Sequence, residues 1–398
     1  MIDAGPAAHF DVCVESTAAP RAFSAPSFAP TPADLICSRT ASELAEAQAL
    51  ADAHRYADAL QALADLDAEA AAGAPHLALR ILHCEGWCLM QLGRLKEAEA
   101  VFERGRTLAE SPGHGELDRA EAAFRLGACR LLRGQVSNAI SLLSVAINLA
   151  QRGGGGGEAT RIRAHEWRAR CHVVQREWEA AQADAERAHE LATALGDPRL
   201  LGLATMQCSV IAERRGAPLV ALFYAERALG FAREAHDRRT EARLLNNIGG
   251  LQFLIGQTAE AVAQLKESFA LSLDIGNDAD AAQAVSSLAQ VHLRSGAPSL
   301  AEEQARYALS ILDDRDDYVD ERGNAHLVLG RALLDQGRHS EALAEFATAE
   351  ELYERLGSAS HVAAAWVANA DALRAGGDVD AAADLYRRAA DALQDVHF

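Results

Sequence analysis

The chain repeats a pattern of small residues about every forty positions along most of its length. Nine marker positions define this period, and successive markers are 39, 41, 42, 40, 40, 40, 41 and 40 residues apart. A period of this size is typical of stacked supersecondary units, each supported by its neighbours, rather than of one globular core. The markers are His54, Gly93, Gly134, Arg176, Gly216, Gly256, Gly296, Gly337 and Gly377.

Each period is predicted to be two helices joined at the marker. An alanine stands five residues after every marker, and Gly, Ala or Ser stands seven residues before it. The segments on both sides of Gly256 carry apolar residues at three- and four-residue spacing, which indicates helices rather than strands. A marker glycine suits the left-handed conformation that ends a helix, and small residues at fixed offsets let two helices approach closely. One such hairpin cannot bury its apolar face alone, so the nine are expected to stack.

These residues resemble the tetratricopeptide repeat family. The family pattern is carried by Leu245, Ile248, Gly249, Gly256 and Ala261, by Gly337, Ala342, Phe346 and Ala349, and by Trp366 in the first helix. The resemblance implies an all-α, right-handed superhelical solenoid of about nine antiparallel hairpins over residues 41–394, followed by a tail at 395–398. The repeats exceed the family's unit of about 34 residues, which longer helices would explain. They look like the long repeats of bacterial regulatory proteins.

The composition of the chain indicates its cellular compartment and the kinds of partner that it can bind. Five of the ten prolines fall in the first 32 residues, so residues 1–40 are expected to form a disordered leader. The leader lacks the basic and apolar regions of a secretory signal, and no apolar run is long enough for a membrane span, which favours the cytoplasm. Seven cysteines without paired spacing argue against a disulfide framework, and a net charge of -19 discourages nucleic-acid binding.

Catalytic, metal and cofactor sites are not expected. Cys84 and Cys88 are four residues apart, but Cys88, Cys129 and Cys171 all stand five residues before a marker, where a small packed residue is needed. The glycine run 153–157 has neither a preceding strand nor a following Lys-Ser or Lys-Thr, so we interpret it as a loop between repeats. No Ser-His-acid set and no HExxH pattern is present.

The first helices are expected to line a concave groove. Positions 13, 10, 6, 3 and 2 residues before each marker, which the resemblance assigns to ligand contact, hold eight arginines and six acidic residues. These arginines either attract a ligand or bridge neighbouring first helices, and the sequence leaves both possibilities open. The predicted polar groove consists of Arg243, Asn246, Asn247, Gln283, Gln290, Arg294, Asn324 and Arg331. The predicted apolar groove includes Phe124, Leu131, Leu203 and Met206.

The sequence therefore predicts a non-catalytic scaffold that binds a protein or peptide. The resemblance implies that the asparagines hold a peptide backbone or a terminal carboxylate, so an acidic segment or a free C-terminus is the expected partner. A homo-oligomer is also compatible with the sequence. The alternative is a sensory or dimerising module of a bacterial signalling protein, such as a cyclic-nucleotide synthase or transcription regulator, whose output domain is supplied elsewhere.

Overall fold

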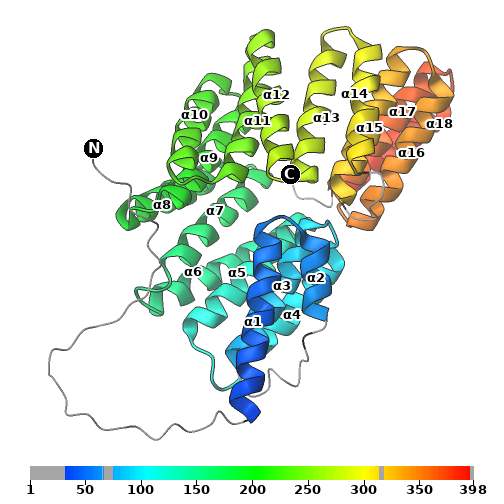
Figure 1. Ribbon diagram of the computed structural model, residues 1–398. Helices are drawn as coiled ribbons and strands as arrows, with labels where there is room; N and C mark the ends of the chain where they lie inside the picture. Colours follow the sequence, from blue (N-terminus) through cyan, green and yellow to red (C-terminus); the bar gives the residue numbers. More distant parts are fainter. Residues whose placement is uncertain (1–31, 65, 67–74, 313–317, 395–398) are drawn as a thin grey trace, which may run out of the picture.

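The computed structural model describes residues 32–64, 66, 75–312 and 318–394, and in these residues the regular elements are eighteen α-helices that pair in sequence order. The predicted all-α solenoid of nine hairpins is confirmed (Figure 1). The helices are α1 Pro32–Asp52, α2 Tyr56–Ala64, α3 Pro75–Gln91, α4 Leu95–Ala109, α5 Glu116–Leu132, α6 Val136–Arg152, α7 Glu158–Val174, α8 Trp178–Leu195, α9 Pro198–Arg214, α10 Pro218–Glu234, α11 Arg238–Leu254, α12 Thr258–Asp274, α13 Asp278–Arg294, α14 Pro298–Ile311, α15 Val319–Asp335, α16 His339–Leu356, α17 Ala359–Ala375 and α18 Val379–Gln394.

The boundary of the expected leader needs correction. Helix α1 begins at Pro32, so residues 32–40 are helical and the repeats begin earlier than residue 41. A proline is well tolerated at the first helical position, because the N–H that it lacks would have no partner within the helix. Residues 1–31 of the leader and the tail at 395–398 lie outside the described residues.

The forty-residue period arises from helices of nearly constant length. Both α11 and α12 contain 17 residues, and three residues join one helix to the next. All nine markers have a positive φ between 58° and 93°, including His54 and Arg176, which are not glycines. The predicted left-handed helix ends are therefore confirmed, and longer helices account for the long repeat.

A second left-handed residue ends the second helix of several hairpins and precedes the cap of the next. Gly196, His236 and Gly276 all have positive φ. The residue that follows each of them accepts a hydrogen bond from the first turn of the next helix; for example, Asp237 accepts from the Thr240 amide at 3.0 Å. Such N-caps satisfy backbone donors that the helix cannot use. Each short connection thus ends one helix and begins another.

The fixed small residues are the contact points within the hairpins. Every alanine five residues after a marker is at most 1% exposed. Where glycine stands seven residues before the marker, a large side chain from the second helix occupies the space that a Cβ would need; at Gly330 this is Phe346, whose Cε1 lies 2.4 Å from the ideal Cβ position. The same relation joins Gly86 to Phe102, Gly127 to Leu143 and Gly249 to Leu265.

The first hairpins meet the later ones, so the solenoid closes on itself. Figure 1 shows α1–α4 lying beside the part of the chain that contains α11–α15. The Tyr318 amide, just before α15, donates to the Leu92 carbonyl at 3.0 Å. Arg239 at the start of α11 donates to Tyr56 Oη at 2.8 Å and to Gln91 Oε1 at 2.7 Å. Residues more than 140 positions apart are therefore in direct contact.

The described part of the chain contains no helix that is both long and apolar enough to cross a membrane.

Candidate functional site

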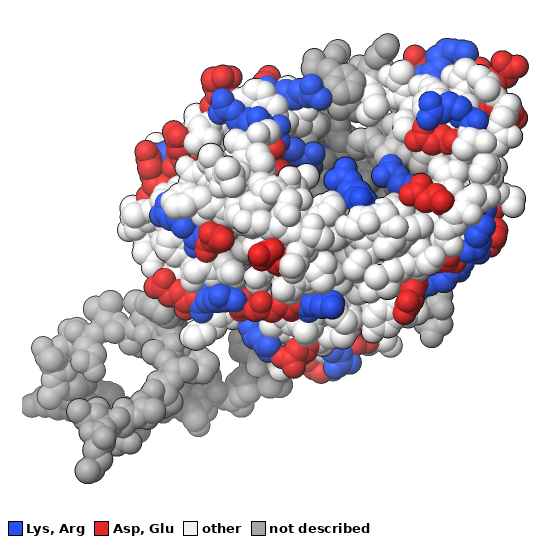
Figure 2. Space-filling view, turned by 90° about the horizontal axis from the view of Figure 1, so that it is seen from above, with Lys and Arg blue, Asp and Glu red and all other residues white. Residues whose placement is uncertain are grey.

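The concave surface is formed by the first helices of the hairpins, which carry odd numbers from α1 to α17. Successive first helices contact one another directly, as α7 does α9 and α13 does α15, whereas no comparable contact joins successive second helices in the described residues. A curved stack is shorter along its inner side, so the helices that approach one another lie on the concave face. Figure 2 shows a hollow in this region with Lys or Arg side chains at its rim. We call the concave face the inner surface.

The arginines of α5 and α7 are engaged by the half-buried carboxylate of Glu121. Glu121 lies 2.8 Å from Arg125 Nη2 and 3.0 Å from Arg163 Nη2, and it also accepts from Thr160 Oγ1 at 2.7 Å. Burial alone would raise the pKa of Glu121, but the two guanidinium groups outweigh it and lower the pKa to about 2. The guanidinium of Arg163 also covers the Phe124 ring at 4.8 Å. This cluster links neighbouring helices and has no free charge to offer a ligand.

Arg170 is engaged in the same way on α7. It donates to Glu166 Oε1 at 2.6 Å and to Gln207 Oε1 on α9 at 3.1 Å, and it lies over the Trp167 ring at 4.7 Å. Burial raises the pKa of Glu166, although Arg170 opposes this effect. Arg163 and Arg170 therefore bridge neighbouring first helices, which is one of the two roles that the sequence left open.

The predicted polar groove on α11, α13 and α15 is more accessible. Arg243 exposes 57% of its side chain, and its Nε lies 3.7 Å from Asp280 Oδ1, too far for a strong hydrogen bond. Gln290, Arg294 and Arg331 are also exposed, and no hydrogen bond or ion pair engages either arginine within the described residues. Three successive first helices therefore each carry an exposed arginine at a predicted groove position.

The predicted amides lie between these arginines and are half-buried: Asn246, Asn247, Gln283 and Asn324. Asn324 Nδ2 donates weakly to Gln283 Oε1 at 3.4 Å, and Asn246 Oδ1 is buried without a partner among the described residues. An amide carries both a donor and an acceptor, so such a row matches the backbone of a peptide.

The predicted apolar groove is largely part of the core. Phe124 is 5% and Met206 is 9% exposed, and both pack within apolar clusters between helices. Leu131 and Leu203 are half-buried against the same clusters. The two buried side chains serve the packing of the solenoid, because they present too little surface to a partner.

Sequence reasoning missed three charged residues near Arg243. Arg239 and Asp280 take part in the closure, with Arg239 Nε 3.4 Å from Asp280 Oδ2. Glu321 lies in the first turn of α15, and its charge and that of Arg243 act on each other. All three stand outside the five offsets that the resemblance assigns to ligand contact, and the contact of Arg239 with α2 and α3 has no local signal in the sequence.

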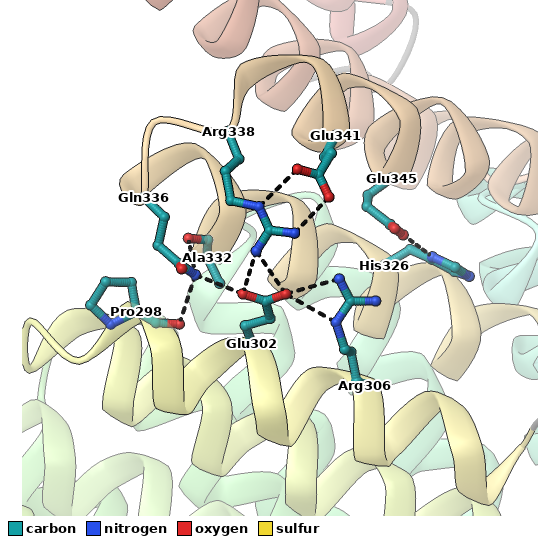
Figure 3. A network of polar contacts seen from close by, with 9 residues as sticks. All are labelled: Pro298, Glu302, Arg306, His326, Ala332, Gln336, Arg338, Glu341 and Glu345. Atoms are coloured by element: carbon teal, nitrogen blue, oxygen red, sulfur yellow. Dashed lines mark hydrogen bonds and ion pairs between the residues drawn. The ribbon is translucent and has the colours of Figure 1, made fainter.

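Two other features of the described structure lie apart from the inner surface. A cavity of about 670 Å³ between α2, α3 and α4 has a mainly aliphatic lining and contains none of the predicted site residues. Figure 3 shows side chains converging on Glu302 of α14. Burial would raise the pKa of Glu302, but hydrogen bonds from Gln336, Arg306 and Arg338 lower it to about 2. This carboxylate links repeats and leaves no open site.

The cysteines and acidic residues form no metal centre in the described part of the chain, where no group of three or more His, Cys, Asp or Glu is arranged to hold an ion. Cys88, Cys129 and Cys171 are fully buried, and burial raises the pKa of the Cys129 and Cys171 thiols to about 12. The predicted packing role of these cysteines is confirmed.

Known proteins of similar structure are helical-repeat proteins. A Rap protein in complex with Competence and Sporulation Factor has a TM-score of 0.58 and 16% identity, covering 90% of this chain and 98% of its own. A Rap conjugation gene regulator of the plasmid pLS20, in complex with the Phr* peptide, has a TM-score of 0.56 and 13% identity, covering 71% and 76%. Aspartyl phosphate phosphatase F from Bacillus subtilis has a TM-score of 0.51 and 15% identity, covering 74% and 76%. At these identities the likeness concerns the fold.

The type of repeat is indicated by the sequence and the structure together. No curated protein sequence matches the chain. A tetratricopeptide repeat family model matches residues 85–155, 314–356 and 327–396. The matched segments cover hairpins at both ends of the solenoid, and the hairpins between them share the same left-handed markers and buried alanines. The chain therefore contains repeats of the tetratricopeptide type over the matched segments, and the hairpins between them have the same geometry.

Proposed function

We propose that this protein is a non-catalytic scaffold that binds an extended or helical segment of a partner along the inner surface of α11, α13 and α15. The observation that supports the proposal most strongly is that the arginines of the first helices differ in their partners and exposure. Arg163 and Arg170 are held by carboxylates, whereas Arg243, Arg294 and Arg331 remain accessible beside half-buried amides. A row of exposed cations in a protein of charge -19 favours an anionic ligand.

The chemistry of this row defines the partner. Guanidinium groups bind carboxylates through paired hydrogen bonds, and amides bind peptide groups without regard to side-chain identity. A segment with acidic side chains or a free C-terminal carboxylate fits both. Two proteins of similar fold were solved with a bound factor or peptide, which supports a peptide ligand for this chain as well.

A randomised decapeptide pool with free C-termini, passed over the immobilised protein, would test the proposal. We expect one or more acidic peptides to be retained and to bind more weakly as the salt concentration rises. Replacing both Arg243 and Arg331 by Glu should lower the affinity of a retained peptide at least about tenfold, which is about 1.4 kcal/mol. The affinity is measured by fluorescence anisotropy.

The control makes the same change of charge on second helices. Arg187 and Arg387 are exposed on α8 and α18, at 45% and 69% of their side chains. Replacing both by Glu should leave the affinity within about twofold, since distant exposed charges are screened by salt. Equal losses in the two double variants, or normal binding by the Arg243 and Arg331 variant, would exclude the inner surface as the binding face.

A further inference from the structure

The outer face of α10 carries large apolar side chains that the neighbouring helices leave largely uncovered. Leu219, Val220 and Phe223 are 69%, 49% and 56% exposed. They stand three, four and seven residues after the marker Gly216. In the other eight hairpins, Leu300 is the only large apolar residue at these three offsets, and Ala or a polar residue occupies the rest. The fold therefore does not require apolar residues there, and an exposed group of them is typical of an interaction surface.

The position of α10 leaves this face open. As a second helix, α10 lies on the convex side of the stack, where it packs against α9 and α11 (Figure 1). Residues three or four positions apart share one side of a helix, so Leu219 and Phe223 form a line that continues to Gly230. Glu226 and Arg227 lie on the two flanks of this line.

Two features of this line indicate that another helix packs on it. Gly230 is exposed, and a Cβ there would meet no atom within 4 Å. Because glycine weakens a helix, its use at this place favours the close approach of another backbone. Glu226 and Arg227 are also exposed and carry opposite charges, and no hydrogen bond or ion pair engages either of them within the described residues. The guanidinium of Arg227 lies 5.7 Å from the centroid of the Phe223 ring.

We propose that this face binds the same face of a second copy of the chain, with the two α10 helices parallel to each other and to a two-fold axis between them. Leu219, Phe223 and Gly230 then each lie beside their own counterparts, so apolar side chains meet and the glycines allow a close approach. The two-fold axis also places Glu226 beside the partner's Arg227 on both flanks of the contact. An antiparallel pair would instead place Glu226 against the partner's Glu226, and the like charges would repel each other.

This inference goes beyond the proposed function and does not depend on it, because α10 lies on the opposite side of the hairpins from the inner surface. The variant with both Arg243 and Arg331 replaced by Glu should therefore dimerise as the wild type does. One helix from each chain makes a small interface, so we expect a dissociation constant in the micromolar range.

Sedimentation equilibrium of the full chain, at concentrations up to about 200 µM, measures the dissociation constant of the dimer. Glu226→Arg and Arg227→Glu should each raise it at least about tenfold, because either change places like charges side by side on both flanks. The double variant exchanges the two charges and restores the opposite pairs, so its dissociation constant should return to within about threefold of the wild type. An equimolar mixture of the two single variants should form a heterodimer for the same reason.

Two further variants complete the test. Gly230→Leu should raise the dissociation constant at least about tenfold by holding the backbones apart, without lowering the melting temperature, because leucine favours a helix. Arg387→Glu is the control: it reverses an arginine on α18 that is 69% exposed, and it should change the dissociation constant by less than about twofold.

Three results would each overturn the inference: a wild type that stays monomeric, single charge variants that dimerise as well as the wild type, or a mixture that forms no heterodimer. Misfolding does not explain the expected result, since the chains that fail to dimerise alone recover when they are mixed.

Discussion

Arg163 and Arg243 occupy the same place in their repeats, thirteen residues before the marker, yet their surroundings differ. On the preceding first helix the position equivalent to Arg163 is Glu121, and the two form an ion pair at 3.0 Å. The equivalent positions on either side of Arg243 are Leu203 and Gln283, which carry no charge. At the scale of residues, the neighbour at the same offset therefore decides whether an arginine is part of the framework or remains available.

The carboxylate at the centre of the engaged cluster should matter for stability. Replacing Glu121 by Gln leaves Arg125 and Arg163 without their carboxylate, so we expect the free energy of unfolding in urea to fall by about 3 kcal/mol. Because the folded-state pKa of Glu121 is about 2, below its ordinary 4.5, its contribution is present above pH 4.5 and is lost as the pH falls toward 2. The free energy of unfolding of Glu121→Gln should therefore fall less than that of the wild type between pH 4.5 and pH 2.

Glu97 provides the matched control. Its side chain is 58% exposed and pairs with Arg94 on the same turn of helix. Exposed pairs of this kind contribute less than about 1 kcal/mol, so Glu97→Gln should be close to neutral. Similar losses in the two variants would mean that the Glu121 cluster is not a structural centre.

At the scale of elements, the two helices of a hairpin match in the size of the side chains at their contact. Glycine seven residues before the marker receives a Leu or Phe from the second helix at four hairpins, as Gly330 receives Phe346. Five hairpins carry Ala or Ser there, and three of them present a buried alanine from the second helix, as at Ala289 and Ala305. At Ser209 the hydroxyl donates to the Ala221 carbonyl at 2.8 Å. Either combination keeps the two helices close.

Adjacent glycines on α11 test this fit. A Cβ at Gly249 would lie 2.7 Å from Leu265 Cγ, whereas a Cβ at Gly250 would meet no atom within 4 Å. Gly249→Ala should therefore lower the stability by about 1 to 3 kcal/mol through overpacking. Gly250→Ala should raise it by up to about 1 kcal/mol, since alanine favours the helix. Thermal unfolding followed by circular dichroism measures both, and shifts of the same sign would contradict the packing.

At the scale of the whole molecule, the closure converts a linear array into a ring. In an open solenoid each repeat contacts only its neighbours. Here an apolar cluster joins residues of α3–α5 to residues of α13–α17, and the Tyr318 amide bonds to Leu92. Hairpins from both ends of the chain are therefore in direct contact, and this contact joins Arg239 of α11 to the first two hairpins.

Arg239 is the polar centre of this closure. Replacing it by Met removes the bonds to Tyr56, Gln91 and Asp280 and should lower the stability by about 2 kcal/mol, because buried polar atoms lose their partner. We also expect a larger radius of gyration by small-angle scattering. Arg238→Met is the control, since Arg238 is 52% exposed and pairs only with an exposed Asp274. An unchanged radius and stability in Arg239→Met would mean that apolar contacts alone hold the ring closed.

The sequence by itself determined the hairpins, because their causes are local. A left-handed residue, a cap and a small residue act within about forty positions, so the period located the helix ends, the buried alanines and the packing role of Cys129. The pairing of Arg163 with Glu121 could also have been found by comparing equal offsets between repeats. Helix α1 began earlier than expected because Pro32 starts a helix as readily as it interrupts one.

The tertiary structure alone decided which side chains are buried and which charged groups from distant repeats lie close together. Phe124 and Met206 belong to the core because neighbouring helices cover them, which no spacing within one repeat reveals. The contact of Arg239 with Tyr56 joins residues 183 positions apart and depends on the curvature accumulated over several hairpins. Small rotations between repeats add up to that curvature, so the charge environment of Arg243 and Glu321 is a property of the closed ring and not of any one repeat.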